Sequence, residues 1–110
     1  MKYFVNDNER KNTVYHEFQK GKWNEKTNWK SDSICLSDDM LYSLGVEELF
    51  FDTIPNYNCF GESVIDRSTW NRIMNKAEKI GGQVYECISE ADIWVQQTFQ
   101  EYDVFTIIGI

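Results

Sequence analysis

The chain has 110 residues, of which 42% are hydrophobic and 15% aromatic, and its formal net charge is −7. This composition predicts one folded domain over residues 1–110 and excludes a disordered chain. A mean hydropathy of −0.54, with no long apolar run and no signal peptide, predicts no membrane association. Three widely spaced cysteines, typical of reduced thiols, add to the expectation of a cytoplasmic protein.

The charge is unevenly distributed along the chain. Residues 1–30 hold seven Lys or Arg and four Asp or Glu, whereas residues 31–110 hold four basic and fourteen acidic residues. The net charge of the second part is therefore −10, which repels phosphate and argues against direct nucleic-acid binding. It favours a basic protein partner, because opposite charge steers association. Solubility alone is the simpler alternative.

Short β-prone runs dominate the start of the chain. Residues 2–5 and 13–18 are predicted as strands, and residues 33–36 form another apolar run. The polar residues 19–33 between them are predicted as a loop or a hairpin arm.

Within that loop, residues 20–30 combine lysines with Trp23 and Trp29. Basic and aromatic residues together are typical of single-strand nucleic-acid binding. Glu25 interrupts the pattern, and aromatic packing on the edge of the sheet is the simpler interpretation. The role of this segment stays open.

A first helix is predicted at about 38–51. Ser37 can cap it, and Asp38 and Asp39 lie in the first turn, where the helix dipole favours anions. Gly45 weakens the middle of this helix.

Two longer helices are predicted at 67–80 and about 84–101. Asp66 can cap the first of them, and its apolar residues recur at helical spacing up to the Gly81-Gly82 pair. The same spacing continues from Val84 to Phe99, so the two helices are expected to form an αα-hairpin.

The last residues, 104–110, are apolar and β-branched and predict a buried C-terminal strand. Strands at both ends with helices between them predict an α+β fold. We expect a small, mostly antiparallel sheet with the three helices packed on one face.

Catalytic and metal-binding motifs are lacking. The cysteines and His16, the single histidine, have no zinc spacing, and no phosphate-binding loop is present, so neither metal nor cofactor is predicted. A hydrolase that uses Cys59 or Cys87 with His16 is a minor alternative, because an acidic surrounding raises the pKa of a thiol. The expectation is a protein without enzymatic activity.

The segment from residue 47 to residue 66 mixes acidic and aromatic side chains between two predicted helices. An interface with an aromatic core and a charged rim has this composition. The simpler alternative is that the aromatic residues are core and the acids are a solvated rim. Phe50 and Phe51 cannot both face inward on a regular helix. The predicted partner-binding residues are Glu47, Glu48, Asp52, Tyr57, Glu62 and Asp66.

Four stretches carry a resemblance to a known group of proteins. They are "LSDDMLYSLGVEELFFDTIPNY", Gly61-Glu62 followed by "VIDRSTWNRI", "AEKIGG" leading into "ADIWV", and the terminal "FTIIGI". In this order, over residues 36–110, the chain resembles immunity proteins of bacterial contact-dependent growth inhibition and related polymorphic toxin systems.

The resemblance implies a small protein that binds one cognate toxin C-terminal domain and neutralises it. Such toxins are often nucleases, and a nuclease needs a basic cleft for phosphate groups. An acidic surface with aromatic side chains can occupy such a cleft. The alternative is a generic protein-binding adaptor module without a toxin partner, and the neighbouring gene distinguishes the two.

Overall fold

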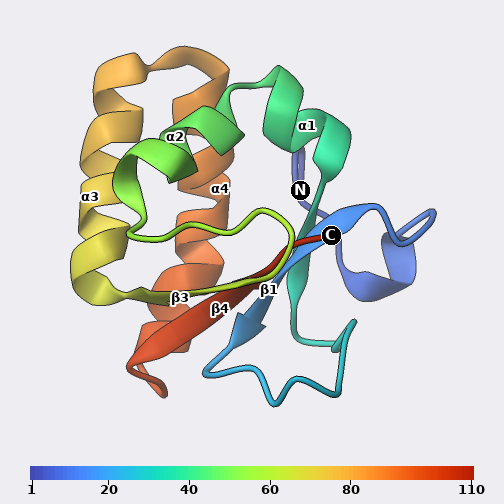
Figure 1. The fold of residues 1–110 in the computed structure, drawn as a ribbon. Coiled ribbons are helices and arrows are strands. Elements are labelled where there is room, and N and C mark those ends of the chain that lie inside the picture. Colours follow the sequence, from blue (N-terminus) through green and yellow to red (C-terminus); the bar gives the residue numbers. More distant parts are fainter.

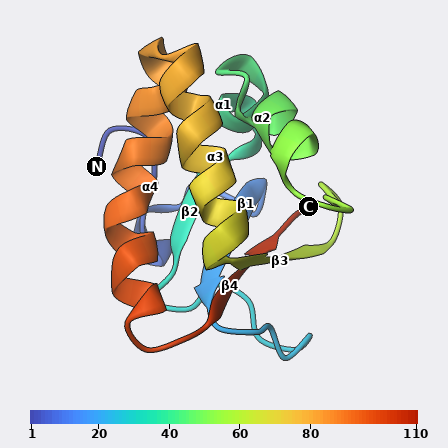
Figure 2. The ribbon, with the colours of Figure 1, turned by 90° about the vertical axis from the view of Figure 1, so that its left-hand side faces the viewer.

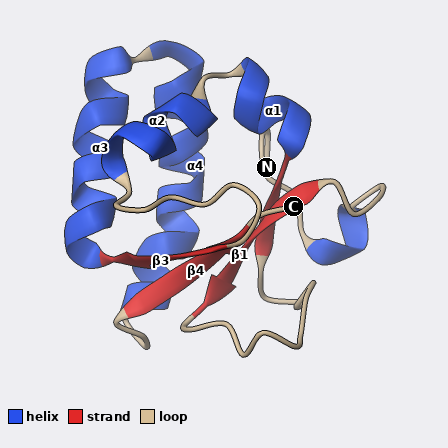
Figure 3. Cartoon of the chain, in the orientation of Figure 1, coloured by secondary structure: helices blue, strands red, loops and turns tan.

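A four-stranded antiparallel sheet forms the base of the molecule in the computed structural model, which describes residues 1–110 (Figures 1 and 3). Four helices pack on one face of this sheet, as the predicted α+β class requires. The strands lie in the order β2-β1-β4-β3. The elements are η1 (Asp7–Glu9), β1 (Tyr15–Lys20), β2 (Ile34–Ser37), α1 (Asp38–Ser43), α2 (Val46–Thr53), β3 (Glu62–Asp66), α3 (Arg67–Ile80), α4 (Gly82–Phe99) and β4 (Val104–Ile108).

The C-terminal strand β4 lies inside the sheet, between β1 and β3. This position explains its apolar composition and confirms the predicted buried strand, although β4 ends at Ile108. Phe105 sits at the centre of the core. The ring centroids of four other aromatic residues lie 5.3 to 5.9 Å from its own, and these residues are Phe18, Trp70, Trp94 and Phe99.

The first predicted helix, 38–51, is two helices in the structure. Ser37 caps α1 by accepting a hydrogen bond from the backbone N–H of Met40, as expected. The chain then breaks at Gly45, whose φ of 87° lies in the left-handed region that glycine adopts without strain. The break turns α2 so that it packs across α3 instead of continuing the axis of α1 (Figure 1).

The predicted αα-hairpin is confirmed. α3 has the bounds 67–80 that the sequence predicted, with the Asp66 side chain as its cap. Gly81, with φ of 71°, ends α3 and starts α4, so α4 covers 82–99 instead of 84–101. The two helices lie side by side on the sheet (Figure 2). No helix of the chain is long and apolar enough to cross a membrane.

Strand β3 was not predicted. Its residues were assigned to the loop between two helices because Gly61 and the cap residue Asp66 dominate the local pattern. The structure pairs β3 antiparallel with β4, so that Val64 lies opposite Thr106. Alternating burial along β3, with Ser63 and Ile65 inside, is the period-2 signal that identifies a half-buried strand.

The predicted strand 2–5 forms only an isolated bridge, in which Val5 and Cys35 exchange two backbone hydrogen bonds. The residues before Val5 are held by a side chain instead. The carboxylate of Glu90 on α4 accepts the backbone N–H groups of Lys2, Tyr3 and Phe4 at 2.8 to 2.9 Å. The N-terminal segment therefore binds a helix as well as the sheet edge.

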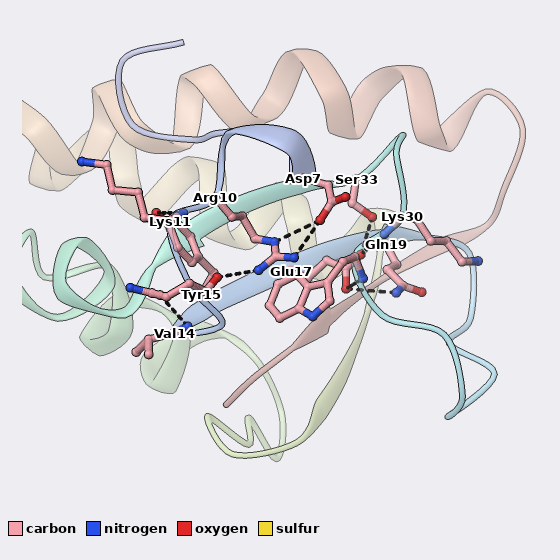
Figure 4. Close-up of polar contacts among 11 residues, drawn as sticks. Asp7, Arg10, Lys11, Val14, Tyr15, Glu17, Gln19, Lys30 and Ser33 are labelled. Carbon is pink, nitrogen blue, oxygen red and sulfur yellow. Dashed lines mark hydrogen bonds and ion pairs between the residues drawn. The ribbon is translucent and has the colours of Figure 1, made fainter.

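A buried carboxylate organises the other face of the sheet. Glu17 on β1 is 1% exposed, and its side chain points away from the helices because its neighbour Phe18 lies in the core. Its oxygens accept the backbone N–H groups of Trp29 and Lys30 at 2.8 and 2.9 Å and the Ser33 hydroxyl at 2.7 Å (Figure 4). The predicted loop 19–33 thus folds back onto β1, which itself runs to Lys20.

Further contacts fix this loop. The Gln19 amide donates to Glu17 at 3.1 Å and to the backbone carbonyl of Thr27 at 2.8 Å. The Arg10 guanidinium lies 3.6 Å from the centroid of the Trp29 ring and also pairs with Asp7. Trp29 therefore packs over the N-terminal region through a cation–π contact. The basic segment 20–30 is an ordered part of the fold.

We expect Glu17→Gln to lower the free energy of unfolding by at least about 2 kcal/mol, because the new amide NH₂ faces backbone donors and leaves them unpaired. Urea unfolding followed by circular dichroism measures this change. Glu25→Gln makes the same substitution at an exposed position of the same loop and should change stability by less than about 0.5 kcal/mol. Equal effects would refute the structural role of Glu17.

Candidate partner-binding surface

A hollow of about 460 Å³ lies where α1 meets α2. Its wall includes the side chains of Tyr42, Glu47, Glu48 and Phe51 around the break at Gly45. Tyr42 is 76% exposed and Phe51 is 53% exposed, so both rings lie open to solvent. Two aromatic rings and two carboxylates therefore share one concave surface, which we call the acid–aromatic hollow.

The two carboxylates of the acid–aromatic hollow have no cationic partner within the chain. Neither Glu47 nor Glu48 belongs to any of the four ion pairs of the chain. Both lie in the first turn of α2, where the positive end of the helix dipole stabilises negative charge. The fold thus holds two free carboxylates beside exposed aromatic rings.

Phe50 and Phe51 do not both face inward, as the helical spacing predicted. Phe50 is fully buried, whereas Phe51 projects outward. Tyr57 lies between them, with ring centroids 5.6 Å from Phe50 and 4.9 Å from Phe51.

Tyr57, one of the predicted partner-binding residues, is not on the surface. It is only 8% exposed, and burial raises the pKa of its hydroxyl. Its ring packs edge-on against the Phe51 ring.

Asp52 does not line the acid–aromatic hollow, although it lies one helical turn after Glu48 and shares a neighbouring pocket with it. Its carboxylate pairs with the Lys76 ammonium on α3 at 3.0 Å. The two side chains line a groove of about 480 Å³ between α2 and α3, together with Arg72 and Lys79. This second groove is mainly basic, so Asp52 contributes little negative potential to the surface where the sequence placed it.

Glu62 and Asp66 are both exposed and lie on β3. The Glu62 side chain points to the face of the sheet opposite the helices, because Ser63 and Ile65 are the buried positions of the strand. The Asp66 carboxylate turns to α3 instead and caps it through a 2.8 Å hydrogen bond from the Thr69 N–H. Of the six predicted residues, only Glu47 and Glu48 line the acid–aromatic hollow, and Glu48 also lines a neighbouring pocket with Asp52.

Two exposed aromatic residues were missed. Tyr42 follows the buried Leu41 on α1, so it points about 100° away from the core stripe. The exposure of Tyr42 could therefore have been predicted from its position in the sequence. Phe60 is 81% exposed in the loop before β3, where no periodic pattern exists to orient it.

Two residues of the alternative hydrolase site, His16 and Cys87, are buried, whereas Cys59 is half-buried. His16 is 1% exposed, and its Nε2 atom lies 2.9 Å from the carboxylate of Asp38. Burial raises the pKa of the Cys87 thiol to about 12, and the pKa of Cys35 likewise. Both thiols are therefore protonated at neutral pH, the form that does not act as a nucleophile.

A scan against protein-family models, a search of curated proteins and a search of solved structures each gave no match.

We expect Asp66→Ala to lower the free energy of unfolding at pH 7 by about 1 kcal/mol, the usual contribution of a helix cap. Hydrogen bonds from Thr69 hold the pKa of the Asp66 carboxyl below its ordinary value. The contribution of the charged carboxylate is thus present above the unfolded-state pKa, near 4, and is lost as the pH falls through the folded-state value.

Urea unfolding at several pH values measures the effect, with Asp66→Asn as the control that keeps a capping oxygen. The gap between wild type and Asp66→Ala should shrink in acid. An equal loss in both variants at pH 7 would contradict the capping role.

Native-state alkylation should separate the three cysteines. With a pKa of about 12, only about one thiol in 10⁵ is ionised at pH 7 for Cys35 and Cys87, so both should react slowly with iodoacetamide. The half-buried Cys59 should react faster. Mass spectrometry of peptides after timed labelling measures the rates. Rapid labelling of Cys87 would favour the hydrolase alternative.

Proposed function

We propose that this chain is an immunity protein that binds and neutralises a cognate toxin domain, a basic nuclease domain. The acid–aromatic hollow is the observation that carries the proposal. It joins two exposed rings, Tyr42 and Phe51, with two carboxylates that have no cation of their own, Glu47 and Glu48.

The chemistry of the hollow suits a basic cleft. A nuclease holds phosphate groups with Lys and Arg, and those side chains can instead meet carboxylates and aromatic faces. The rings supply apolar contact area at the centre of an interface, and the carboxylates speed association through their field. An acidic surface of this kind can compete with a nucleic-acid substrate for the cleft.

Tight binding is needed for protection, because a single unbound toxin molecule can act on many substrate molecules. A nanomolar complex corresponds to roughly 12 kcal/mol of binding free energy. A few buried anchors provide most of such a value in known interfaces, where each anchor contributes about 2 kcal/mol or more. Phe51 is suited to this role because its ring packs against Tyr57, and Tyr57 packs in turn against the buried Phe50.

The decisive measurement uses the domain encoded directly upstream of this gene. We expect it to be basic and to bind this chain with a 1:1 ratio in isothermal titration calorimetry. The association rate should fall steeply as salt rises from 50 to 300 mM, because screening removes the steering field. A stable complex with a partner that lacks toxicity would favour the adaptor alternative.

Charge reversal tests where the interface lies. We expect Glu47→Lys with Glu48→Lys to weaken binding at least tenfold and to abolish protection of cells that express the toxin. The matched control is Glu78→Lys with Glu101→Lys, which makes the same change in net charge at exposed positions away from the acid–aromatic hollow. Equal weakening by both pairs would show that net charge, not this surface, governs binding.

A further inference from the structure

The two edges of the sheet differ. At the β2 edge, Val5 bridges to Cys35 through two backbone hydrogen bonds, so the N-terminal segment covers that edge. At the other edge, β3 pairs with β4 alone. An uncovered edge strand presents backbone N–H and C=O groups that can pair with another chain.

The hydrogen-bond register shows which groups of β3 are free. The Gly109 N–H donates to the Gly61 carbonyl, so this pair, and every second pair along the ladder, is the hydrogen-bonded kind. The intervening residues Glu62 and Val64 therefore direct both their N–H and their C=O away from β4. No backbone or side-chain group of the chain bonds to them on that side.

The same residues carry a distinctive side-chain pattern. Glu62, Val64 and Asp66 occupy alternate positions of β3 and are all exposed. Glu62 and Val64 point to the face opposite the helices, and the Asp66 carboxylate, at the end of the strand, bonds to the first turn of α3. The side chain of Val64 is apolar, yet this residue is 47% exposed. The free edge strand therefore carries an acidic, an apolar and an acidic residue at its alternate, exposed positions.

This pattern argues against a second copy paired symmetrically about Val64. Two β3 strands paired antiparallel about Val64 would place Glu62 of one chain opposite Asp66 of the other. Like charges directly opposite each other across strands are destabilising. The complementary strand carries basic residues at both flanks and an apolar residue between them.

We propose that β3 receives an extended segment of the toxin domain, which adds antiparallel to the sheet as a fifth strand. Its pattern is basic, any residue, apolar, any residue, basic, with the apolar side chain opposite Val64 and the basic side chains opposite Glu62 and Asp66. Main-chain hydrogen bonds give affinity in this mode and alternate side chains give specificity. The inference rests on the proposed function for the identity of the partner.

The edge of β3 and the acid–aromatic hollow can serve one partner. Strand β3, the loop 54–61 and helix α2 lie on the same side of the molecule in both views (Figures 1 and 2). Phe60, 81% exposed, belongs to the loop that joins them. A domain that docks on α2 would thus find the strand edge within the same footprint.

A peptide tests the edge without any toxin. The probe is acetylated and amidated Thr-Lys-Thr-Val-Thr-Lys-Thr, titrated into ¹⁵N-labelled protein and followed by amide chemical shifts. We expect shifts centred on residues 62–66. A control peptide with Glu in place of both Lys should bind at least tenfold more weakly. Equal binding of both peptides, or shifts elsewhere on the surface, would overturn the inference.

A matched pair of variants tests the backbone contact. Val64→Pro removes the outward N–H, which the ladder to β4 does not use, and Val64→Thr keeps it. The Thr variant should bind the lysine peptide nearly as wild type does, and the Pro variant should lose binding. If Val64→Pro fails to fold, a peptide N-methylated at its valine provides the same deletion from the other side. Full binding by that methylated peptide would refute strand addition.

The two proposals fail separately. Peptide binding at β3 without any complex with the upstream domain would leave the edge site standing and reject the immunity function. A tight complex that Val64→Pro leaves unchanged would support immunity and reject the fifth strand.

Discussion

The arrangement of the N-terminal third depends on one buried carboxylate, that of Glu17. Two consecutive backbone N–H groups, those of Trp29 and Lys30, point at it, as in the backbone anion-binding concavities known as nests. Trp29 adopts a left-handed φ of 61°, which is unfavourable for a bulky residue and is offset here by these hydrogen bonds. The polar loop becomes the cover of β1 because Glu17 satisfies its backbone.

The same logic recurs where other elements meet. Glu90 gathers three N–H groups of the N-terminal segment, and Asp92 accepts the indole N–H of Trp70 at 2.8 Å. Asp52 is neutralised by Lys76. Much of the negative charge of residues 31–110 therefore holds the fold together. The charge count from the sequence overstates what is available to a partner, and the free carboxylates of Glu47 and Glu48 matter more for that reason.

Regular patterns made much of the fold predictable. The spacing of Trp70, Ile73 and Ala77, with Asp66 before it, defined α3 to the residue, since burial and capping agree there. Strand β3 could not be predicted, because its five residues follow a glycine and include the helix cap, which leaves too short a pattern. The docking of residues 2–5 was equally hidden, because it depends on Glu90, which lies 85 or more residues away in the sequence.

The candidate surface was predictable only in part. Helical geometry alone separated Phe50 from Phe51, and it could have exposed Tyr42 by the same argument. It could not place Asp52 beside Lys76 or bury Tyr57, because both depend on how α2 crosses α3 after the break at Gly45. Residues close together in the sequence therefore lie in three places: Phe51 in the acid–aromatic hollow, Asp52 in the groove between α2 and α3, and Tyr57 in the core.

The ordered loop 21–33 has one more consequence. It carries three lysines and the two acids Glu25 and Asp32, so its net charge is only +1. Helices α1 and α2 lie at the opposite end in both views (Figures 1 and 2) and carry five acidic residues and no basic one. The unequal charge of the two ends gives a permanent dipole moment directed from the helices to the loop. In the field of a positive domain such a molecule experiences a torque and rotates before contact. The rotational search is then shortened, and the side that carries α2 arrives first.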